Sequence, residues 1–119
     1  MPEEPAHQKN LDIRYHEIEG VDPNLLSLDL YAPDDDAGKR PVMIMIHGGG
    51  WRGGDKANSS VADNKAICFT RAGYVFVSIN YRLSPEVQHP THVEDVARAL
   101  AWVHAHISEY SGDPGRIFV

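Results

Sequence analysis

A short apolar stretch that runs into three glycines is the part of this sequence with the clearest chemical meaning. Residues 42–46 read V-M-I-M-I, and H-G-G-G-W follows at once at 47–51. A continuous apolar run bounded by turn residues is typical of a buried strand, and glycines after it leave backbone N–H groups that no side chain covers. Such groups can stabilise the negative oxygen that forms when a carbonyl is attacked. We therefore interpret the N–H groups of Gly49 and Gly50 as an oxyanion hole, in preference to a plain tight turn.

A second set of polar residues, Tyr81, Arg82 and Asp95, is predicted to form a structural polar cluster. Tyr81 and Arg82 follow another apolar run at 74–79, and Asp95 lies in the helical pattern that comes next. An ion pair between Arg82 and Asp95 is one hypothesis, and two separate surface charges are the alternative.

Seven histidines raise the question of a metal site. His104 and His106 are two residues apart on a predicted helix, so they point about 200° apart and cannot share a metal. His89 and His92 flank the start of that helix and could converge, but the sequence has no H-E-x-x-H and a single cysteine. We therefore predict no metal site and no cofactor.

The apolar patterns predict five strands. Alternating apolar residues indicate strands at about 11–15 and 26–30, close enough in sequence to form an antiparallel hairpin. Continuous apolar runs indicate buried strands at 42–46 and 74–79. A G-D-P-G turn precedes a last strand that starts at Arg116.

Two helices are predicted between these strands. One covers 58–72 and ends at Gly73, and the other runs from a T-H-V-E capping box to about residue 110. Strands that alternate with helices favour an α/β fold, with a mostly parallel sheet and helices on both faces. We expect one domain over residues 11–119, preceded by a flexible arm at 1–10.

Four segments in this order resemble the esterase and lipase type of α/β-hydrolase. They are similar to bacterial carboxylesterases related to feruloyl esterases and kynurenine formamidases, and to hormone-sensitive-lipase-like esterases. The likeness runs from about Leu11 to Val119 and implies the α/β-hydrolase fold, ending before its nucleophile elbow. The similar segments are H-G-G-G-W with G-D-K at 54–56, N-Y-R-L-S-P-E at 80–86, V-E-D-V at 93–96 with W-V at 102–103, and G-D-P-G-R-I at 112–117.

The resemblance also implies roles for the residues around the glycines. The catalytic histidine of this family lies C-terminal to its serine, so His47 is expected to orient the loop rather than to act as the base. Gly48, Trp51 and Asp55 are expected to hold the loop in shape, and Trp51 could also line the acyl pocket.

The nucleophile that the resemblance implies has no counterpart in this sequence. In the family it lies in a G-x-S-x-G turn after the strand that in this chain starts at Arg116, and the acid and the histidine follow it. The sequence contains no G-x-S-x-G. We therefore expect the isolated chain to be inactive, and we expect no nucleophile among its serines: Ser59, Ser60, Ser78, Ser84, Ser108 and Ser111.

The function expected from the resemblance is that of a serine hydrolase acting on small carboxylic esters, to which this chain contributes the oxyanion loop. Aryl formamides are the alternative substrates. A non-catalytic module, or a split protein that pairs with a separate C-terminal chain, is the alternative class. In the family's sheet order, residues 43–46 would lie at or near an open edge, through which the chain could self-associate.

Composition limits the remaining partners. The net charge of −6 argues against binding to nucleic acid, and no apolar stretch approaches the roughly 20 residues of a membrane span. The N-terminus lacks the features of a signal peptide, so we expect a cytoplasmic protein. The single cysteine, Cys68, excludes a disulfide within the chain and is expected to be buried.

Overall fold

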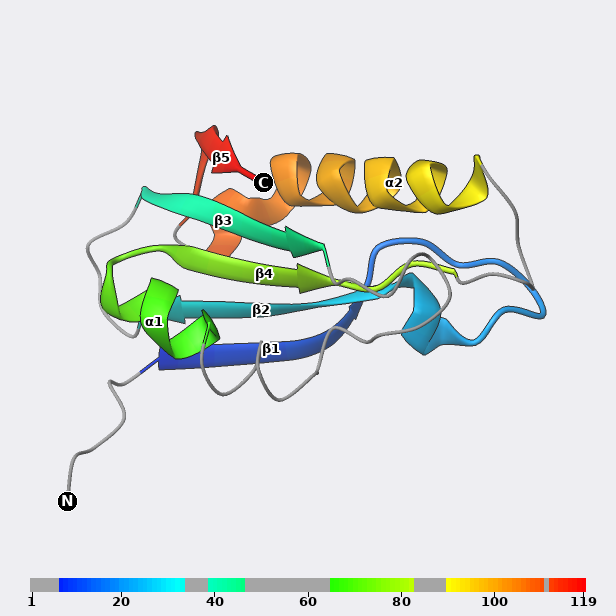
Figure 1. Cartoon of the computed structure of the whole chain (residues 1–119), viewed down its shortest axis with the longest axis horizontal. Coiled ribbons are helices and arrows are strands. Elements are labelled where there is room, and N and C mark those ends of the chain that lie inside the picture. Colours follow the sequence, from blue (N-terminus) through cyan, green and yellow to red (C-terminus); the bar gives the residue numbers. More distant parts are fainter. Residues whose placement is uncertain (1–6, 34–38, 47–64, 83–89, 111) are drawn as a thin grey trace, which may run out of the picture.

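The computed structural model describes residues 7–33, 39–46, 65–82, 90–110 and 112–119. Within these ranges, five strands form one sheet, accompanied by two α-helices and two short 3-10 helices (Figure 1). The elements are β1 (His7–Arg14), η1 (Pro23–Leu26), β2 (Ser27–Pro33), β3 (Arg40–Ile46), α1 (Ala66–Arg71), β4 (Val75–Ile79), α2 (Thr91–His106), η3 (Ile107–Tyr110) and β5 (Gly112–Phe118).

The sheet is mixed, with the strand order β1-β2-β4-β3-β5. The pairs β1–β2 and β2–β4 are antiparallel, whereas β3 runs parallel to both β4 and β5. The expectation of a mostly parallel sheet therefore holds only for β3, β4 and β5, because the opening hairpin presents β2 to β4 in the opposite direction. β3 lies between β4 and β5.

The helices cover opposite faces of the sheet, as predicted. On one face, α1 packs over Tyr31 and Phe76, and the rings of Phe69 and Phe76 stack with centroids 5.4 Å apart. On the other face, a larger cluster joins the alternate strand residues to α2. Its buried members include Leu28, Leu30, Val42, Ile44, Val75, Val77, Ile79, Val96, Ala99 and Val103.

The end of α1 follows the predicted glycine cap. Gly73 has φ +93°, a left-handed conformation that suits glycine. Its N–H donates to the carbonyl of Thr70 at 3.0 Å, and the N–H of Tyr74 donates to the carbonyl of Phe69 at 2.9 Å. This is a Schellman motif, which stops the helix and turns the chain into β4. The part of the predicted helix before residue 65 lies outside the described residues.

β1 begins earlier than the sequence pattern predicts. Residues 7–10 pair with residues 30–33 of β2, so the flexible arm predicted for 1–10 is wrong for 7–10. These residues are polar because they belong to a sheet-edge strand, and they therefore carry no apolar alternation. The strand is also bulged between Asn10 and Ile13, where Asp12 has φ +56° and donates its N–H to Asp29 Oδ1 at 2.9 Å.

Two details of the helices also differ from prediction. The capping box is wrong, because Thr91 lies within the first turn of α2, and the N-cap is Pro90, whose carbonyl accepts the N–H of Glu94 at 3.0 Å. Cys68 is exposed rather than buried, because α1 turns Ala66 and Thr70 toward the sheet. The predicted end near Tyr110 is met by α2 together with η3.

β5 contains the G-D-P-G segment as a bulge instead of beginning after it. Gly112 pairs with Arg40 and Ile117 pairs with Val42, so most of the intervening residues bulge out of register. Within the bulge, Asp113 Oδ1 accepts the N–H of Gly115 at 2.8 Å.

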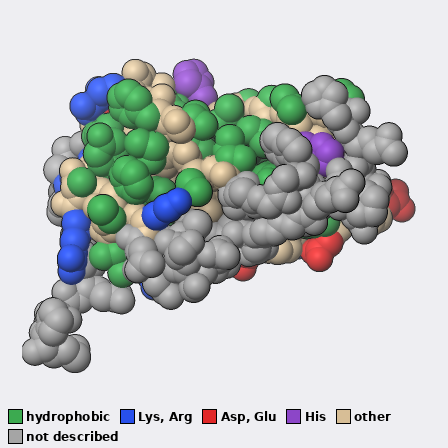
Figure 2. Space-filling view, in the orientation of Figure 1, with side chains coloured by type: hydrophobic (Ala, Val, Ile, Leu, Met, Phe, Trp, Pro, Cys, Tyr) green, Lys and Arg blue, Asp and Glu red, His purple; other side chains and the backbone are tan. Residues whose placement is uncertain are grey.

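Large apolar side chains that are exposed lie on three of these elements. Leu11 belongs to β1 and Val93 to α2, whereas Phe118 and Val119 lie together at the end of β5. The space-filling view shows hydrophobic side chains gathered on the left of the molecule, in the region that extends from β5 past β3 toward α1 (Figure 2).

Candidate functional site

The candidate site lies where the parallel strands β3 and β4 end. Ile46, the last residue of β3, is opposite Ile79, the last residue of β4. The residue after Ile46 is His47, where the glycine segment begins. The predicted site residues His47, Gly48, Gly49, Gly50, Trp51 and Asp55 lie outside the described residues. The structure therefore describes the frame beside them, formed by the ends of these strands, the start of α2 and the connection between β1 and β2.

Asn80, directly after β4, is fixed from three directions. Its backbone N–H donates to the carbonyl of Ser27 at 2.9 Å, and its side-chain Nδ2 donates to the carbonyl of Asn24, also at 2.9 Å. Its own carbonyl accepts the hydroxyl of Tyr15 at 2.7 Å. Because Asn80 is only 2% exposed, these bonds are shielded from water and hold the backbone in place as it leaves the sheet.

Sequence reasoning does not single out Tyr15 or Asn80 as functional residues. The pattern marks Tyr15 only as an apolar residue of a strand, and no local signal joins it to a residue 65 positions later. Burial, and after it the nearby charge of Asp95, raises the pKa of Tyr15 above its ordinary value. The phenol therefore stays protonated and remains a hydrogen-bond donor to Asn80.

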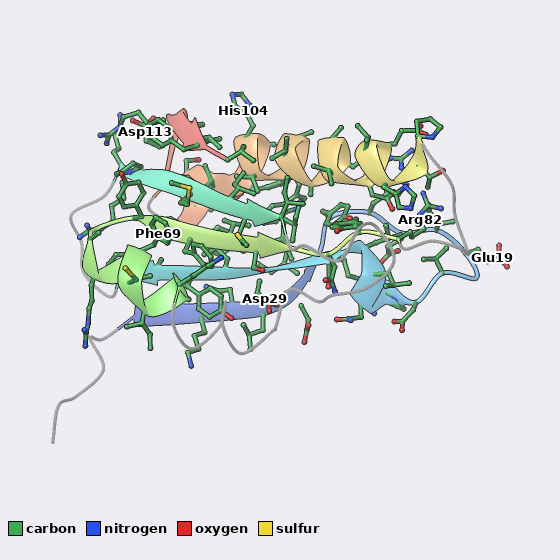
Figure 3. All side chains as sticks on the ribbon, in the orientation of Figure 1. Glu19, Asp29, Phe69, Arg82, His104 and Asp113 are labelled. Carbon is green, nitrogen blue, oxygen red and sulfur yellow. The ribbon has the colours of Figure 1, made fainter. Side chains whose placement is uncertain are left out.

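Asp95 joins the start of α2 to the segment after β4. It is fully buried, and its Oδ2 accepts the backbone N–H of Arg82 at 3.0 Å and the Nε of Arg82 at 2.9 Å. Its Oδ1 accepts a nitrogen of the Arg82 guanidinium at 2.9 Å and one of Arg98 at 3.2 Å. The hypothesised ion pair between Arg82 and Asp95 is thus present, with the two-pronged geometry that favours arginine and carboxylate. Figure 3 shows Arg82 near the start of α2.

The ion pair also favours the charged form of Arg82. The hydrogen bond to Asp95 raises the pKa of Arg82, while partial burial acts in the opposite direction. Four donors on one buried carboxylate offset the cost of removing it from water. The backbone at Arg82 is consequently tied to α2, 13 residues further along the chain.

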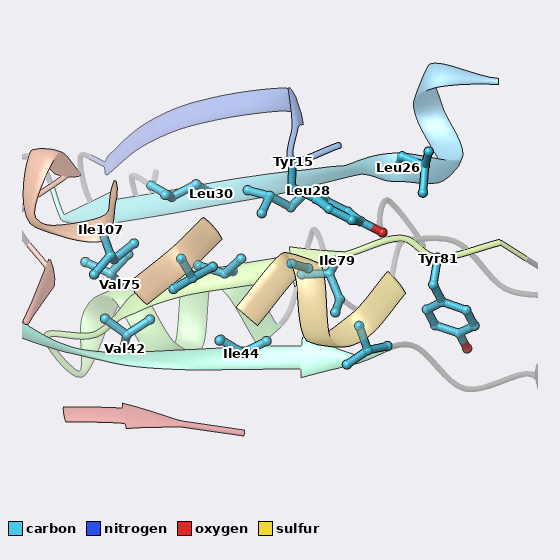
Figure 4. Packing of buried hydrophobic residues seen from close by; sticks show 14 of the residues in the cluster. Tyr15, Leu26, Leu28, Leu30, Val42, Ile44, Val75, Ile79, Tyr81 and Ile107 are labelled. Carbon is cyan, nitrogen blue, oxygen red and sulfur yellow. The ribbon is translucent and has the colours of Figure 1, made fainter. Parts of the chain in front are cut away.

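Tyr81, the third member of the predicted cluster, lies in the hydrophobic core. It is 2% exposed and belongs to the same apolar cluster as Tyr15 and Ile79 (Figure 4). Burial raises the pKa of its hydroxyl. In the described structure, Tyr81 is a large side chain that packs in the core just after the end of β4.

Two hollows border the connection between β1 and β2, and the smaller one is lined by Asn24 and Ser27, which bond to Asn80 after β4. The larger one, of about 400 Å³, is lined by the connection between β1 and β2, including His16, Ile18 and Leu26. None of the described residues predicted for the site lines it, so we do not assign substrate binding to it.

Neither a metal cluster nor a membrane-spanning helix occurs among the described residues. In that part of the chain, no group of three histidine, cysteine or acidic side chains is arranged to hold a metal ion. No helix there is both long and apolar enough to cross a membrane.

The hairpin, the following parallel strands and the helices on both faces define the first part of an α/β-hydrolase fold. The chain belongs to the BD-FAE family of α/β-hydrolase esterases, which it matches over residues 28–119.

Named relatives agree with this assignment. The chain is 46% identical over 94 residues to the probable carboxylic ester hydrolase LipM of Mycobacterium tuberculosis, covering 77% of this chain and 21% of LipM. Among solved structures, it is similar to a truncated carbohydrate esterase from gut microbiota, with a TM-score of 0.80 and 25% identity, covering 98% of this chain and 39% of that one. It is also similar to esterase 2 of Thermogutta terrifontis phosphorylated by paraoxon, with a TM-score of 0.71 and 28% identity, covering 98% and 43%. The chain thus spans between about a fifth and two fifths of the length of these relatives.

Proposed function

We propose that this chain contributes the oxyanion hole of a carboxylic ester hydrolase, with the N–H groups of Gly49 and Gly50 as donors. In this proposal His47, Gly48, Trp51 and Asp55 hold the glycine segment in shape. The substrates are small carboxylic esters. A nucleophile attacks the ester carbonyl, the two N–H groups stabilise the resulting oxyanion, and water then hydrolyses the acyl-enzyme.

The observation that carries the proposal is the position at which the glycine segment begins. It follows β3 at the level where the parallel strand β4 also ends. In open α/β sheets, ligands bind outside the carboxyl ends of the parallel strands. The bonds at Asn80 and the Arg82–Asp95 pair make the neighbouring chain segment rigid, and oxyanion donors need such rigidity to be aligned before the reaction.

The nucleophile is proposed to come from outside residues 1–119, because the sequence has no G-x-S-x-G. The register of β5 supports this arrangement. Phe118 lies opposite Met43, so a parallel strand three residues longer would end beside Ile46. A nucleophile that followed such a strand would lie about one strand spacing, roughly 4.8 Å, from the start of the glycine segment.

The test joins this chain, through Val119, to the part of LipM that follows its matched segment. We expect the joined protein to hydrolyse p-nitrophenyl butyrate and the 119-residue chain alone to show no activity above background. An amide-to-ester replacement that removes the N–H of Gly50 should then lower kcat about 10²–10³-fold.

The same replacement at Gly115 is the control, because that N–H donates to Asp113 within the bulge of β5. Equal losses at Gly50 and Gly115 would contradict an oxyanion role for Gly50. Preferential hydrolysis of an aryl formamide over the ester would support the alternative substrate class.

A second function, as a module that pairs with a separate C-terminal polypeptide, is favoured by one observation. β3 continues to Ile46, but its described pairing with β5 ends at Met43. In this second proposal, a strand of the separate polypeptide pairs with β3 at Ile44–Ile46. Self-association through the same edge is the competing outcome.

A further inference from the structure

The larger hollow, in the connection between β1 and β2, has the size and part of the lining of a small-molecule site. Its volume of about 400 Å³ falls within the range of such sites, about 300–1,000 Å³. Ile18, Val21 and Leu26 supply apolar lining. Because Leu28 of β2 lies opposite Ile79 of β4, the connection lies at the end of the sheet where β4 ends.

Backbone hydrogen bonds hold the walls of this hollow in place. The N–H of Val21 donates to the carbonyl of Ile18 at 3.1 Å, and the N–H of Tyr15 donates to the carbonyl of Leu26, also at 3.1 Å. Gly20, inside the first of these turns, has φ +83°, a left-handed conformation that suits glycine. The hollow is therefore formed before a ligand enters it, which reduces the entropic cost of binding.

The segment around the hollow is strongly acidic. Residues 12–22 contain four carboxylates and one guanidinium, so with histidine neutral they carry a net charge of −3, half of the −6 of the whole chain. The carboxylates of Glu17 and Glu19 line the hollow itself, and Figure 3 shows Glu19 at this end of the molecule. A concentration of one sign of charge around a hollow attracts ligands of the opposite sign.

Arg14 is the group whose charge opposes a positive ligand. Its guanidinium lies 3.1 Å from Glu17 Oε1, in a pair whose side chains are both exposed. It lines the larger hollow and also the smaller one of about 230 Å³, where Asp12 adds a further carboxylate. Glu19 has no ion-pair partner in the part of the chain that the structure describes.

We propose that the larger hollow binds an organic cation with an apolar body, of the alkylammonium class. The ammonium group lies beside the carboxylates of Glu17 and Glu19 and donates charge-assisted hydrogen bonds to them. The alkyl chain packs against Ile18 and Val21, where its burial adds to the affinity. This site is separate from the ester site of the proposed function.

An anion of the same size fits the hollow less well. Arg14 is already paired with Glu17, so an anionic ligand would have to displace that carboxylate. It would also meet the like charge of Glu19. The sign of the charge on the ligand is therefore the sharpest property to test.

The test titrates the 119-residue chain with hexylammonium and follows its backbone amides by NMR. Hexanoate is the comparison for charge, because it has the same chain length and the opposite sign, and methylammonium is the comparison for the apolar body. We expect shifts confined to residues 14–26 and an affinity for hexylammonium at least about tenfold higher than for either comparison compound.

Substitutions around the hollow should change the affinity in opposite directions. Glu17→Gln and Glu19→Gln should each weaken hexylammonium binding at least about threefold. Arg14→Gln should strengthen it about threefold or more, because it removes a like charge and releases Glu17. Circular dichroism of each variant checks that the chain stays folded.

Glu109→Gln is the matched control for Glu17→Gln. Both carboxylates belong to exposed pairs with a basic residue three positions earlier, and their side chains are 66% and 75% exposed respectively. Glu109 lies in η3 and does not line the hollow. Its substitution should change the affinity less than about twofold.

Four results would overturn the proposal. They are binding of hexanoate as tightly as hexylammonium, weaker hexylammonium binding by Arg14→Gln, equal losses from Glu109→Gln and Glu17→Gln, and shifts spread over the whole chain. The last two would indicate only general attraction to a negatively charged protein. The titration measures no ester hydrolysis, so its outcome does not depend on the proposed function.

Discussion

The two edge strands of this sheet are exposed to solvent in different ways. β1 is blunted along its length by charged side chains and by the bulge at Asp12, whose N–H is bonded to Asp29. β5 is blunted only in its first half, around Asp113, and its second half ends in exposed apolar residues. Proteins protect edges that remain in water. The protection is therefore spread along β1 but confined to the first half of β5.

The same contrast extends to the bonds that secure each side. The β1 side is tied to the end of β4 by the hydroxyl of Tyr15, and the end of β4 is tied to α2 by Asp95. The β5 side is held by its pairing with β3 and by Gly112, which packs against Ile107 and Val42. One side thus depends on buried polar bonds and the other on close packing.

The largest effect is expected from Asp95→Asn, which removes the charge that holds Arg82 and Arg98. The free energy of unfolding should fall by about 3–5 kcal/mol, because one partner of a buried pair is left uncompensated. Urea unfolding of the chain at neutral pH measures this. Glu109→Gln removes a carboxylate from an exposed pair with His106 and should cost less than about 1 kcal/mol. Similar losses for the two variants would show that the buried network is not the main anchor.

A smaller loss is expected from Gly112→Ala, which tests the packing that secures β5. A Cβ at this position would clash with Ile107 Cγ1 and lie 3.0 Å from Val42 Cγ2. The overpacking should cost about 1–3 kcal/mol and should increase amide hydrogen exchange in β3 before β1. Gly115→Ala, in the exposed bulge, is the control and should change stability by less than about 0.5 kcal/mol. Faster exchange in β1 than in β3 would contradict the division between the two sides.

Tyr15→Phe probes the β1 side without creating a cavity. Loss of the hydrogen bond to the Asn80 carbonyl should reduce the free energy of unfolding by about 1 kcal/mol at neutral pH. Because the folded-state pKa of Tyr15 is raised, the folded state binds more protons than the unfolded state above about pH 10, and stability falls as pH rises. Thermal unfolding between pH 8 and pH 11 should therefore show a shallower alkaline decline in the variant. An identical decline would assign that dependence to other groups, such as Tyr81.

The smallest effect is expected from Asp113→Asn in the blunted half of β5. The N–H of Gly115, and after it the side chain of Arg116, hold the pKa of Asp113 below its usual value. Its contribution to stability is therefore present above the unfolded carboxyl pKa of about 4 and is lost as pH falls through the lower folded value. A series of melting temperatures from pH 6 to pH 2 should show a slightly smaller acid loss in the variant. A larger fall of the melting temperature at acid pH in the variant would contradict a stabilising effect of ionised Asp113.

The sequence patterns predict the regular elements well and their irregularities poorly. Apolar runs locate β3 and β4, and Gly73 locates the end of α1, because burial and a left-handed turn each demand particular residue types. The start of β1 at His7 escapes prediction, since an exposed edge strand carries no apolar pattern. The bulge in β5 is predicted only in part, because the G-D-P-G sequence also suits a turn that precedes a strand.

The sequence likewise predicts some contacts of the candidate site and misses others. The Arg82–Asp95 pair follows from the sequence as a hypothesis, since both residues stand beside apolar patterns that converge at one end of the sheet. The bond from Tyr15 to Asn80 cannot be predicted in this way, because it depends on where two distant segments meet. The assignment of Gly49 and Gly50 remains a prediction, supported by the strand that leads into them.

The position of β4 between β2 and β3 has a consequence for how the chain folds as it is synthesised. β3 precedes β4 in the sequence, yet β2 and β3 meet only through β4. Until residues 75–79 have been synthesised, β2 lacks β4 on one side, and β3 lacks both of its neighbours, β4 and β5. Emergence of residues 75–79 supplies a neighbour to both strands at once, so we expect the hairpin and the parallel part to join in a single late step. Such non-local pairing is slow, and it leaves two apolar strands open to chaperone binding until β4 has left the ribosome.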